Sequence, residues 1–144
     1  MSIINYIDTH CHLDGEEFAQ DRDAVVQRAR EAGCTRIFLP AIDVTSCHTV
    51  LDVCAQYPDY CYPMLGLHPE EVRADWREQL AAIRKCLDTS LTSKLLAIGE
   101  VGLDYYWSRE FEKEQLEAFE EQVRWAVELQ LPLMIHCRKA QNRS

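Results

Sequence analysis

The sequence predicts an α/β fold with five parallel strands joined by four crossover helices. Short apolar runs typical of strands alternate with amphipathic helical patterns from end to end, and no Pro/Gly/Ser-rich linker divides them. Such alternation implies right-handed crossovers between parallel strands. By itself the pattern fits an open doubly wound sheet as well as the first five-eighths of a (β/α)8 barrel, a fold that normally needs roughly 250 residues.

The five predicted strands are short apolar runs, each followed by polar residues or by Gly and Pro. Because their apolarity is nearly continuous, we expect them to be buried on both faces. They are predicted over residues 3–8, 36–41, 60–66, 95–99 and 131–136.

The four predicted helices follow from their end signals and their apolar spacing. Helices over residues 22–32 and 45–57 end at Gly33 and Pro58, which are natural terminators. The third helix is expected to start after Asp75, and the fourth near Ser108. Apolar residues at spacings of three and four give these two helices a core-facing stripe. The stripes are Trp76, Leu80, Ile83 and Leu87 in the third helix, and Phe111, Leu116, Phe119, Val123, Trp125 to Val127 and Leu129 in the fourth.

Length and composition predict one globular domain over residues 1–144, since 47% of the residues are hydrophobic and can form one core. No apolar stretch approaches the roughly eighteen residues that span a bilayer, and no secretory signal pattern is present. The seven cysteines are odd in number and include no Cys-x-x-Cys, so we expect reduced thiols. These features predict a cytoplasmic protein without a membrane partner.

The formal net charge of −9 argues against sequence-independent binding along an extended stretch of nucleic acid, because such binding depends on many Lys and Arg contacts to phosphates. Divalent cations can supply local positive charge that this count omits. The composition therefore favours a small phosphodiester substrate, or contact with a DNA end, over a long binding groove.

Histidines and a glutamate follow the ends of three predicted strands. His10 and His12 come after the first strand, Glu100 after the fourth, and His136 closes the fifth. In a barrel, residues at the carboxyl ends of different strands point toward one mouth. Three imidazoles and a carboxylate are ligands suited to Zn, Mn, Fe or Ni, with Mg less favoured beside nitrogen. His68, just beyond the third strand, is a further candidate for contacting substrate or orienting a ligand.

Four motifs in order make the chain resemble the TatD family of metal-dependent hydrolases, TatD-like DNases. The resemblance implies a TIM-type (β/α)8 barrel, of which this chain would be the N-terminal part, with two divalent cations (Zn, Mn or Mg). It also implies phosphodiester hydrolysis by activated water, in several members as a 3′-to-5′ deoxyribonuclease. The motifs are Asp8-Thr9-His10-Cys11-His12-Leu13-Asp14, Gly66-Leu67-His68-Pro69, Ile98 to Tyr106 and Pro132 to Arg138.

Carried over by position, the resemblance implies that His10 and His12 bind one cation, that Glu100 bridges the pair, and that His136 binds the other. It places His68 beside the substrate phosphate. Glu100 and His68 are thus the expected catalytic residues.

Further positions match the family's motifs without a fixed role. Arg138 is expected to contact substrate together with His68. Asp104 is expected to cap or brace the loop after Glu100, while Asp8 and Asp14 would orient the histidines or their loop.

The family's pattern continues with another metal-binding His and a late catalytic Asp, whereas residues 137–144 contain neither. We therefore expect a truncated site with little or no turnover, because ligands of one site act as a unit. Open sheet edges predict self-association. Two alternatives remain: a related barrel hydrolase of amides or esters, and a catalytically inactive fragment that acts at most as a binding module.

Overall fold

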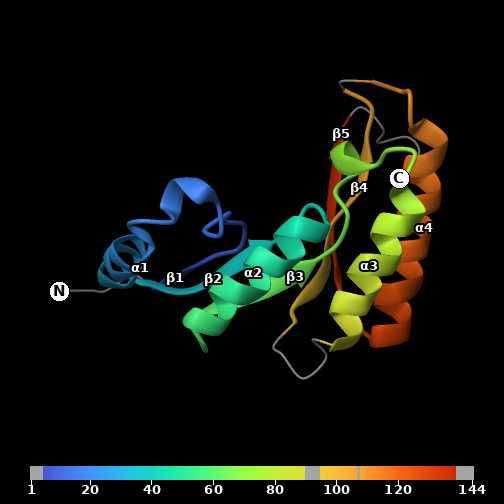
Figure 1. The fold of residues 1–144 in the computed structure, drawn as a ribbon. Helices are drawn as coiled ribbons and strands as arrows, with labels where there is room; N and C mark the ends of the chain where they lie inside the picture. The colour runs from blue at the N-terminus through green and yellow to red at the C-terminus, as the bar shows by residue number, and fades with distance from the viewer. Residues whose placement is uncertain (1–4, 90–94, 107, 139–144) are drawn as a thin grey trace.

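The computed structural model describes residues 5–89, 95–106 and 108–138. Its centre is a curled sheet of five parallel strands in the order β1-β2-β3-β4-β5, as Figure 1 shows. The parallel α/β prediction is therefore confirmed, and the curl is that of half a barrel. The strands are β1 (Tyr6–Asp8), β2 (Cys34–Pro40), β3 (Cys61–Leu65), β4 (Ala97–Asp104) and β5 (Leu133–Arg138).

Two strand predictions were wrong in a way that matters for the site. Glu100 does not follow the fourth strand but lies inside β4, and His136 lies inside β5 rather than at its end. The ladder between β4 and β5 runs on through the pairs Gly102↔His136 and Asp104↔Arg138. A Gly-Glu pair resembles strand-ending punctuation, but here backbone pairing continues past it. Of the first predicted strand, residues 3 and 4 lie outside the described residues.

Burial on both faces holds for β4 and nearly for β3, holds only in part for β2, where Thr35 and Arg36 are exposed, and fails at the edges. Every residue of β4 is buried, whereas Ile7 in β1 is 45% exposed and Ile135 in β5 is 52% exposed. Each edge strand has one sheet neighbour among the described residues, so part of its apolar surface is left uncovered.

The helices begin and end close to where their sequence signals indicate. The prediction for Gly33 is confirmed: it follows the first helix with a φ of 101°, in the left-handed region that suits glycine. The fourth helix begins at Glu112, later than expected, and Ser108 instead accepts a hydrogen bond from the Glu110 amide. The helices are α1 (Arg22–Glu31), α2 (Val44–Gln56), α3 (Trp76–Thr89) and α4 (Glu112–Leu129), with short 3-10 turns at η1 (Glu16–Phe18) and η2 (Pro69–Glu71).

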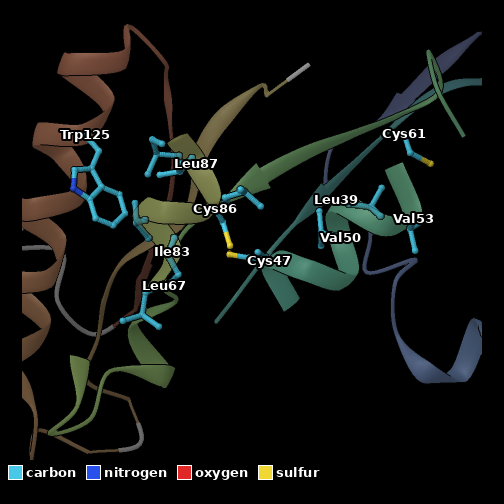
Figure 2. Packing of buried hydrophobic residues seen from close by; sticks show 14 of the residues in the cluster. Leu39, Cys47, Val50, Val53, Cys61, Leu67, Ile83, Cys86, Leu87 and Trp125 are labelled. Atoms are coloured by element: carbon cyan, nitrogen blue, oxygen red, sulfur yellow. The ribbon is translucent and has the colours of Figure 1, made fainter. Parts of the chain in front are cut away.

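The core lies between the sheet and helices α2, α3 and α4. Figure 2 shows Ile83 and Leu87 of α3 facing Trp125 of α4, with Cys47 and Cys86 at the contact between α2 and α3. The predicted apolar stripe of α3 is thus confirmed as core. The stripe of α4 holds only in part: Trp125 and Ala126 are buried, but Val127 is 73% exposed. All seven cysteines lie among the described residues, and none forms a disulfide. Burial raises the pKa of the Cys47 thiol to about 12, as expected for a packed, unreactive side chain.

Two buried glutamines of α4 attach this helix to the ends of β3 and β4. The Leu67 amide donates to Gln122 Oε1 at 2.8 Å, and Gln122 Nε2 donates to Leu67 O at 3.4 Å. One seven-residue step away, Gln115 makes the same pair of bonds with the backbone of Asp104, at 2.8 and 3.0 Å. These bonds satisfy backbone groups that would otherwise be buried and unpaired. They fix the backbone on which His68 and Asp104 stand.

The described residues contain no helix that is both long and apolar enough to span a membrane.

Candidate metal centre

The carboxyl ends of the strands surround an open cavity of about 630 Å³. All three strand-end motifs with histidine contribute to it, together with Glu100. The lining residues are His10, His12, Asp14, Gly15, Ile42, Ser46, His68, Glu70, Glu71, Glu100 and His136.

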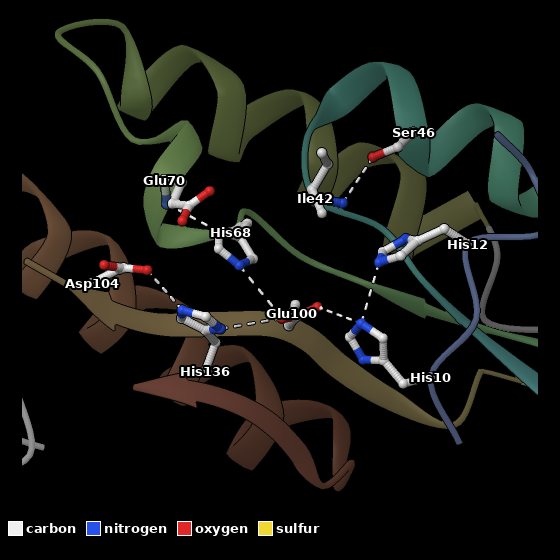
Figure 3. Close-up of polar contacts among 9 residues, drawn as sticks. All are labelled: His10, His12, Ile42, Ser46, His68, Glu70, Glu100, Asp104 and His136. Carbon is white, nitrogen blue, oxygen red and sulfur yellow. Dashed lines mark hydrogen bonds and ion pairs between the residues drawn. The ribbon is translucent and has the colours of Figure 1, made fainter. Parts of the chain in front are cut away.

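Glu100 stands at the centre of the polar contacts, as Figure 3 shows. Its side chain is almost fully buried, and its two oxygens face different partners. Oε2 lies 3.4 Å from His10 Nε2, while Oε1 lies 3.4 Å from His68 Nε2 and 3.5 Å from His136 Nδ1. The Glu100 carboxylate of β4 therefore contacts histidines from three other places in the sheet: after β1, after β3 and within β5.

The environment of Glu100 favours its ionised form. Burial alone would raise the pKa of this carboxyl, but the hydrogen bond and charge of His68 outweigh that effect, with help from His10 and His136. The pKa is lowered from its ordinary value. A buried carboxylate held ionised among imidazoles is available as a ligand.

His10 and His12 form the exposed side of the site. Their Nε2 atoms lie 3.2 Å apart, and the rings meet edge to face. The Asp8 carboxylate accepts a hydrogen bond from the His10 amide at 3.1 Å, which is the loop-orienting contact expected of it. Asp14 accepts from the Thr49 hydroxyl at 2.7 Å through Oδ2, which ties the same loop to α2.

His68 and His136 form the inner side of the site. Their ring centroids lie 4.6 Å apart. His136 Nε2 lies 2.8 Å from Asp104 Oδ2, and Asp104 Oδ1 accepts from the Tyr106 amide at 2.9 Å. Asp104 thus braces the loop after β4, whereas the expected loop directly after Glu100 is part of β4, and it also contacts a candidate ligand.

Gly102 allows β5 to approach β4 at this point. Its φ is 142°, and a Cβ placed on it would lie 1.9 Å from the backbone oxygen of His136. A residue with a side chain would push β5 away and displace His136 from Glu100.

The donor atoms fit divalent cations. His10, His12 and Glu100 offer one ligand atom each within 4.8 Å of one another, and His68, Glu100 and His136 do the same. Mixed imidazole and carboxylate donors suit Zn or Mn. Because each group uses Glu100, the arrangement also suits two cations that share this carboxylate.

The structure brings together five of the six predicted site residues: His10, His12, His68, Glu100 and His136. Arg138 is different, since it does not line the cavity and its guanidinium lies 3.8 Å from the centroid of the Tyr106 ring.

Sequence reasoning missed Glu70, which lies within ligand distance of Asp104 and His136. Its position directly after the Gly-Leu-His-Pro motif was the available signal. Glu71 and Ser46 also line the cavity and carried no such signal.

Comparison with known proteins places this centre in a family. A sequence model of the TatD related DNase family matches residues 7–144. The chain belongs to the TatD family. This confirms the resemblance predicted from the four motifs.

Relatives and solved structures agree with this assignment. A 3′-5′ ssDNA/RNA exonuclease TatD from Erwinia tasmaniensis is 36% identical over 136 residues, which cover 94% of this chain and 51% of the relative. The uncharacterized metal-dependent hydrolase YabD of Bacillus subtilis is 35% identical over 133 residues, covering 92% and 51%. The crystal structure of YJJV, a TatD homologue from Escherichia coli K12, superposes with a TM-score of 0.83 at 31% identity, covering 99% of this chain and 54% of that one. This chain therefore spans about half the length of the TatD relatives that it matches.

Proposed function

We propose that this chain carries the cation-binding centre of a hydrolase that cleaves phosphodiester bonds at the 3′ ends of DNA. The observation that carries the proposal is Glu100, whose two oxygens face two separate groups of histidines. This is the ligand arrangement that a shared pair of divalent cations requires. The name of the Erwinia relative adds single-stranded DNA and RNA as candidate substrates.

Each site residue receives a role from its position. His10 and His12 would hold one cation, Glu100 would hold both, and His136 would hold the second. Bound cations would supply Lewis-acid polarisation of the phosphoryl group and lower the pKa of water. His68, whose Nε2 faces the cavity beside Glu100, would donate a hydrogen bond to a substrate phosphate oxygen. Arg138 stays a candidate for substrate contact, which would require its guanidinium to leave Tyr106.

The donor set supports Zn²⁺ or Mn²⁺ over Mg²⁺, because nitrogen donors outnumber oxygen donors. Isothermal titration with each ion alone tests the number and the identity of the cations. We expect two sites for Zn²⁺ and weaker binding of Mg²⁺. A single site that survives removal of Glu100 would contradict the shared arrangement.

Nuclease activity is tested by following the shortening of a 5′-labelled single-stranded DNA from its 3′ end with added Mn²⁺. We expect the wild-type chain to shorten the DNA faster than Glu100→Gln does, because Glu100 would hold both cations. Equal rates in the two proteins would contradict the proposed function.

An amide or ester hydrolase is the rival enzyme, because related barrels share the His-x-His pair. Parallel assays with a lactone, an amide and the DNA oligonucleotide separate the two. Cation-dependent hydrolysis of the lactone or the amide, without hydrolysis of the DNA, would favour the amide or ester hydrolase. Cation binding without hydrolysis of any of the three would favour a binding module.

The exposed edge strands support a proposal of self-association. Ile7 on β1 and Ile135 on β5 leave apolar surface uncovered at opposite edges of the sheet. We expect light scattering to show concentration-dependent association, reduced when Ile135 is replaced by Lys. A monomer at all concentrations would contradict this.

A cytoplasmic location is likewise proposed, and imaging of a tagged chain would test it.

A further inference from the structure

The two histidines that face Glu100 Oε1 differ in what holds their far ring nitrogens. His68 presents Nε2 to Glu100, and His136 presents Nδ1, at nearly equal distances of 3.4 and 3.5 Å. Which of these nitrogens carries a proton decides which ring can bind a cation there, since only a bare nitrogen is a ligand.

The far nitrogen of His68 is an acceptor. Its Nδ1 accepts a hydrogen bond from the Glu70 amide at 3.0 Å, at the start of η2. A backbone N–H is always a donor, so Nδ1 carries no proton when it makes this bond. In the neutral ring the proton is therefore on Nε2, the atom that faces Glu100.

The far nitrogen of His136 faces an acceptor. Its Nε2 lies 2.8 Å from Asp104 Oδ2, and the Tyr106 amide holds the other oxygen of that carboxylate. The Tyr106 amide is a donor, so the Asp104 carboxylate accepts through Oδ1 and turns Oδ2, its second acceptor oxygen, toward His136. In the neutral ring the proton is on Nε2, and Nδ1 presents a bare lone pair to Glu100.

We propose that Asp104 is a positioning residue that selects the Nε2–H form of His136, and so makes His136 the cation ligand and His68 the hydrogen-bond donor of the inner site. Both rings carry the proton on Nε2, yet they present opposite ends to Glu100. A carboxylate that fixes the tautomer of a ligating histidine is a common support of metal sites. The inference rests on the proposed function, in which His136 holds a cation. Its test, the tautomer of His136, does not depend on that function.

The direct test is long-range ¹H–¹⁵N NMR of the metal-free protein labelled with ¹⁵N-histidine, at a pH where the rings are neutral. His136→Gln and His68→Gln assign the two signals. We expect the Nε2–H form for both histidines. The Nδ1–H form of His136, or a ring that keeps both protons, would overturn the proposal, whatever the protein hydrolyses.

Asp104→Asn gives a sharper outcome than removal of the side chain. The Tyr106 amide donates to the Oδ1 position, so the Asn oxygen is held there and the NH₂ group faces His136. An NH₂ donor forces His136 Nε2 to accept, which moves the proton to Nδ1 and blocks the ligand atom.

We therefore expect Asp104→Asn to convert His136 to the Nδ1–H form and to weaken Zn²⁺ binding at the second site by about 10- to 100-fold. Asp104→Ala should weaken it less, because Nδ1 remains free to lose its proton. Asp88→Asn, the same change on the exposed face of α3, is the matched control and should change neither signal. A merely structural role for Asp104 predicts the opposite order, with Ala worse than Asn, and that order would overturn the proposal. If the second site is absent from the wild-type chain, the proposed function fails while the NMR result still decides the tautomer.

Discussion

The two sides of the site differ in how firmly the protein holds them. On the outer side, His10 and His12 follow a three-residue edge strand, and both are exposed. On the inner side, Glu100 lies in β4, where all eight residues are buried, and its neighbours are held by hydrogen bonds from α4 and from the loop after β4. The inner side is therefore held by packing and by the protein's own hydrogen bonds. The outer pair is exposed, so we expect a bound cation to contribute more to holding it.

The largest expected effect comes from Glu100, which belongs to both sides. Glu100→Gln keeps the size of the side chain but replaces one ligand oxygen with an NH₂ group. We expect Zn²⁺ affinity to fall by more than about 100-fold at both sites, since losing even an outer partner of a ligand costs about 10- to 100-fold. Isothermal titration measures this, with Glu71→Gln as control because Glu71 lines the cavity outside the ligand groups. Loss at one site alone would show that the two sides do not share this carboxylate.

The second prediction concerns the packing behind the inner side. Gln122→Leu leaves the backbone N–H and C=O of Leu67 buried without partners, at a cost of about 1–3 kcal/mol each. We expect the free energy of unfolding to fall by about 2–4 kcal/mol in urea titrations. Gln27→Leu on α1 is the control, because Gln27 is exposed and its side chain donates to Glu31 on the helix surface. An unchanged stability would mean that the backbone after β3 is held by other contacts.

Gln115 and Gln122 of α4 show what the sequence did and did not predict. Alternation of apolar runs predicted the parallel sheet. Placing His10, Glu100 and His136 at strand ends predicted one shared site, although Glu100 and His136 lie inside β4 and β5. The extent of β4 was missed, because pairing with β5 carries the strand through polar residues. Gln115 and Gln122 were missed as well. A glutamine within an apolar stripe looks like an ordinary helix residue until the backbone groups that it satisfies are known.

The third prediction separates the outer side from folding. His12→Ala removes an exposed ligand, so we expect Zn²⁺ affinity at the outer site to fall by about 10- to 100-fold while the free energy of unfolding without metal changes by less than about 0.5 kcal/mol. Isothermal titration and metal-free urea unfolding measure the two quantities on the same preparation. His48→Ala, an exposed histidine of α2, is the control. A large loss of metal-free stability would show that the outer pair is already held without the cation.

The smallest expected effect tests whether the cavity wall nearest the outer histidines is held locally. Asp43 caps α2: its side chain accepts from the Ser46 amide at 2.8 Å, and the Ser46 hydroxyl accepts from the amides of Ile42 and Asp43 at 2.8 and 2.9 Å. Ile42 and Ser46 line the cavity, so this capping box shapes the wall there.

Asp43→Ala should lower the free energy of unfolding by about 1 kcal/mol, the usual cost of losing a helix cap. Asp43→Asn keeps an acceptor oxygen and serves as the matched variant, with a loss of only a few tenths of a kcal/mol expected. Zn²⁺ affinity should stay unchanged in both, because neither Ile42 nor Ser46 belongs to the ligand groups. A fall in affinity at the outer site in Asp43→Ala would show instead that the start of α2 orders His10 and His12. The outer side would then be held by the protein before the cation binds, and its contrast with the inner side would be smaller than the exposure of its histidines indicates.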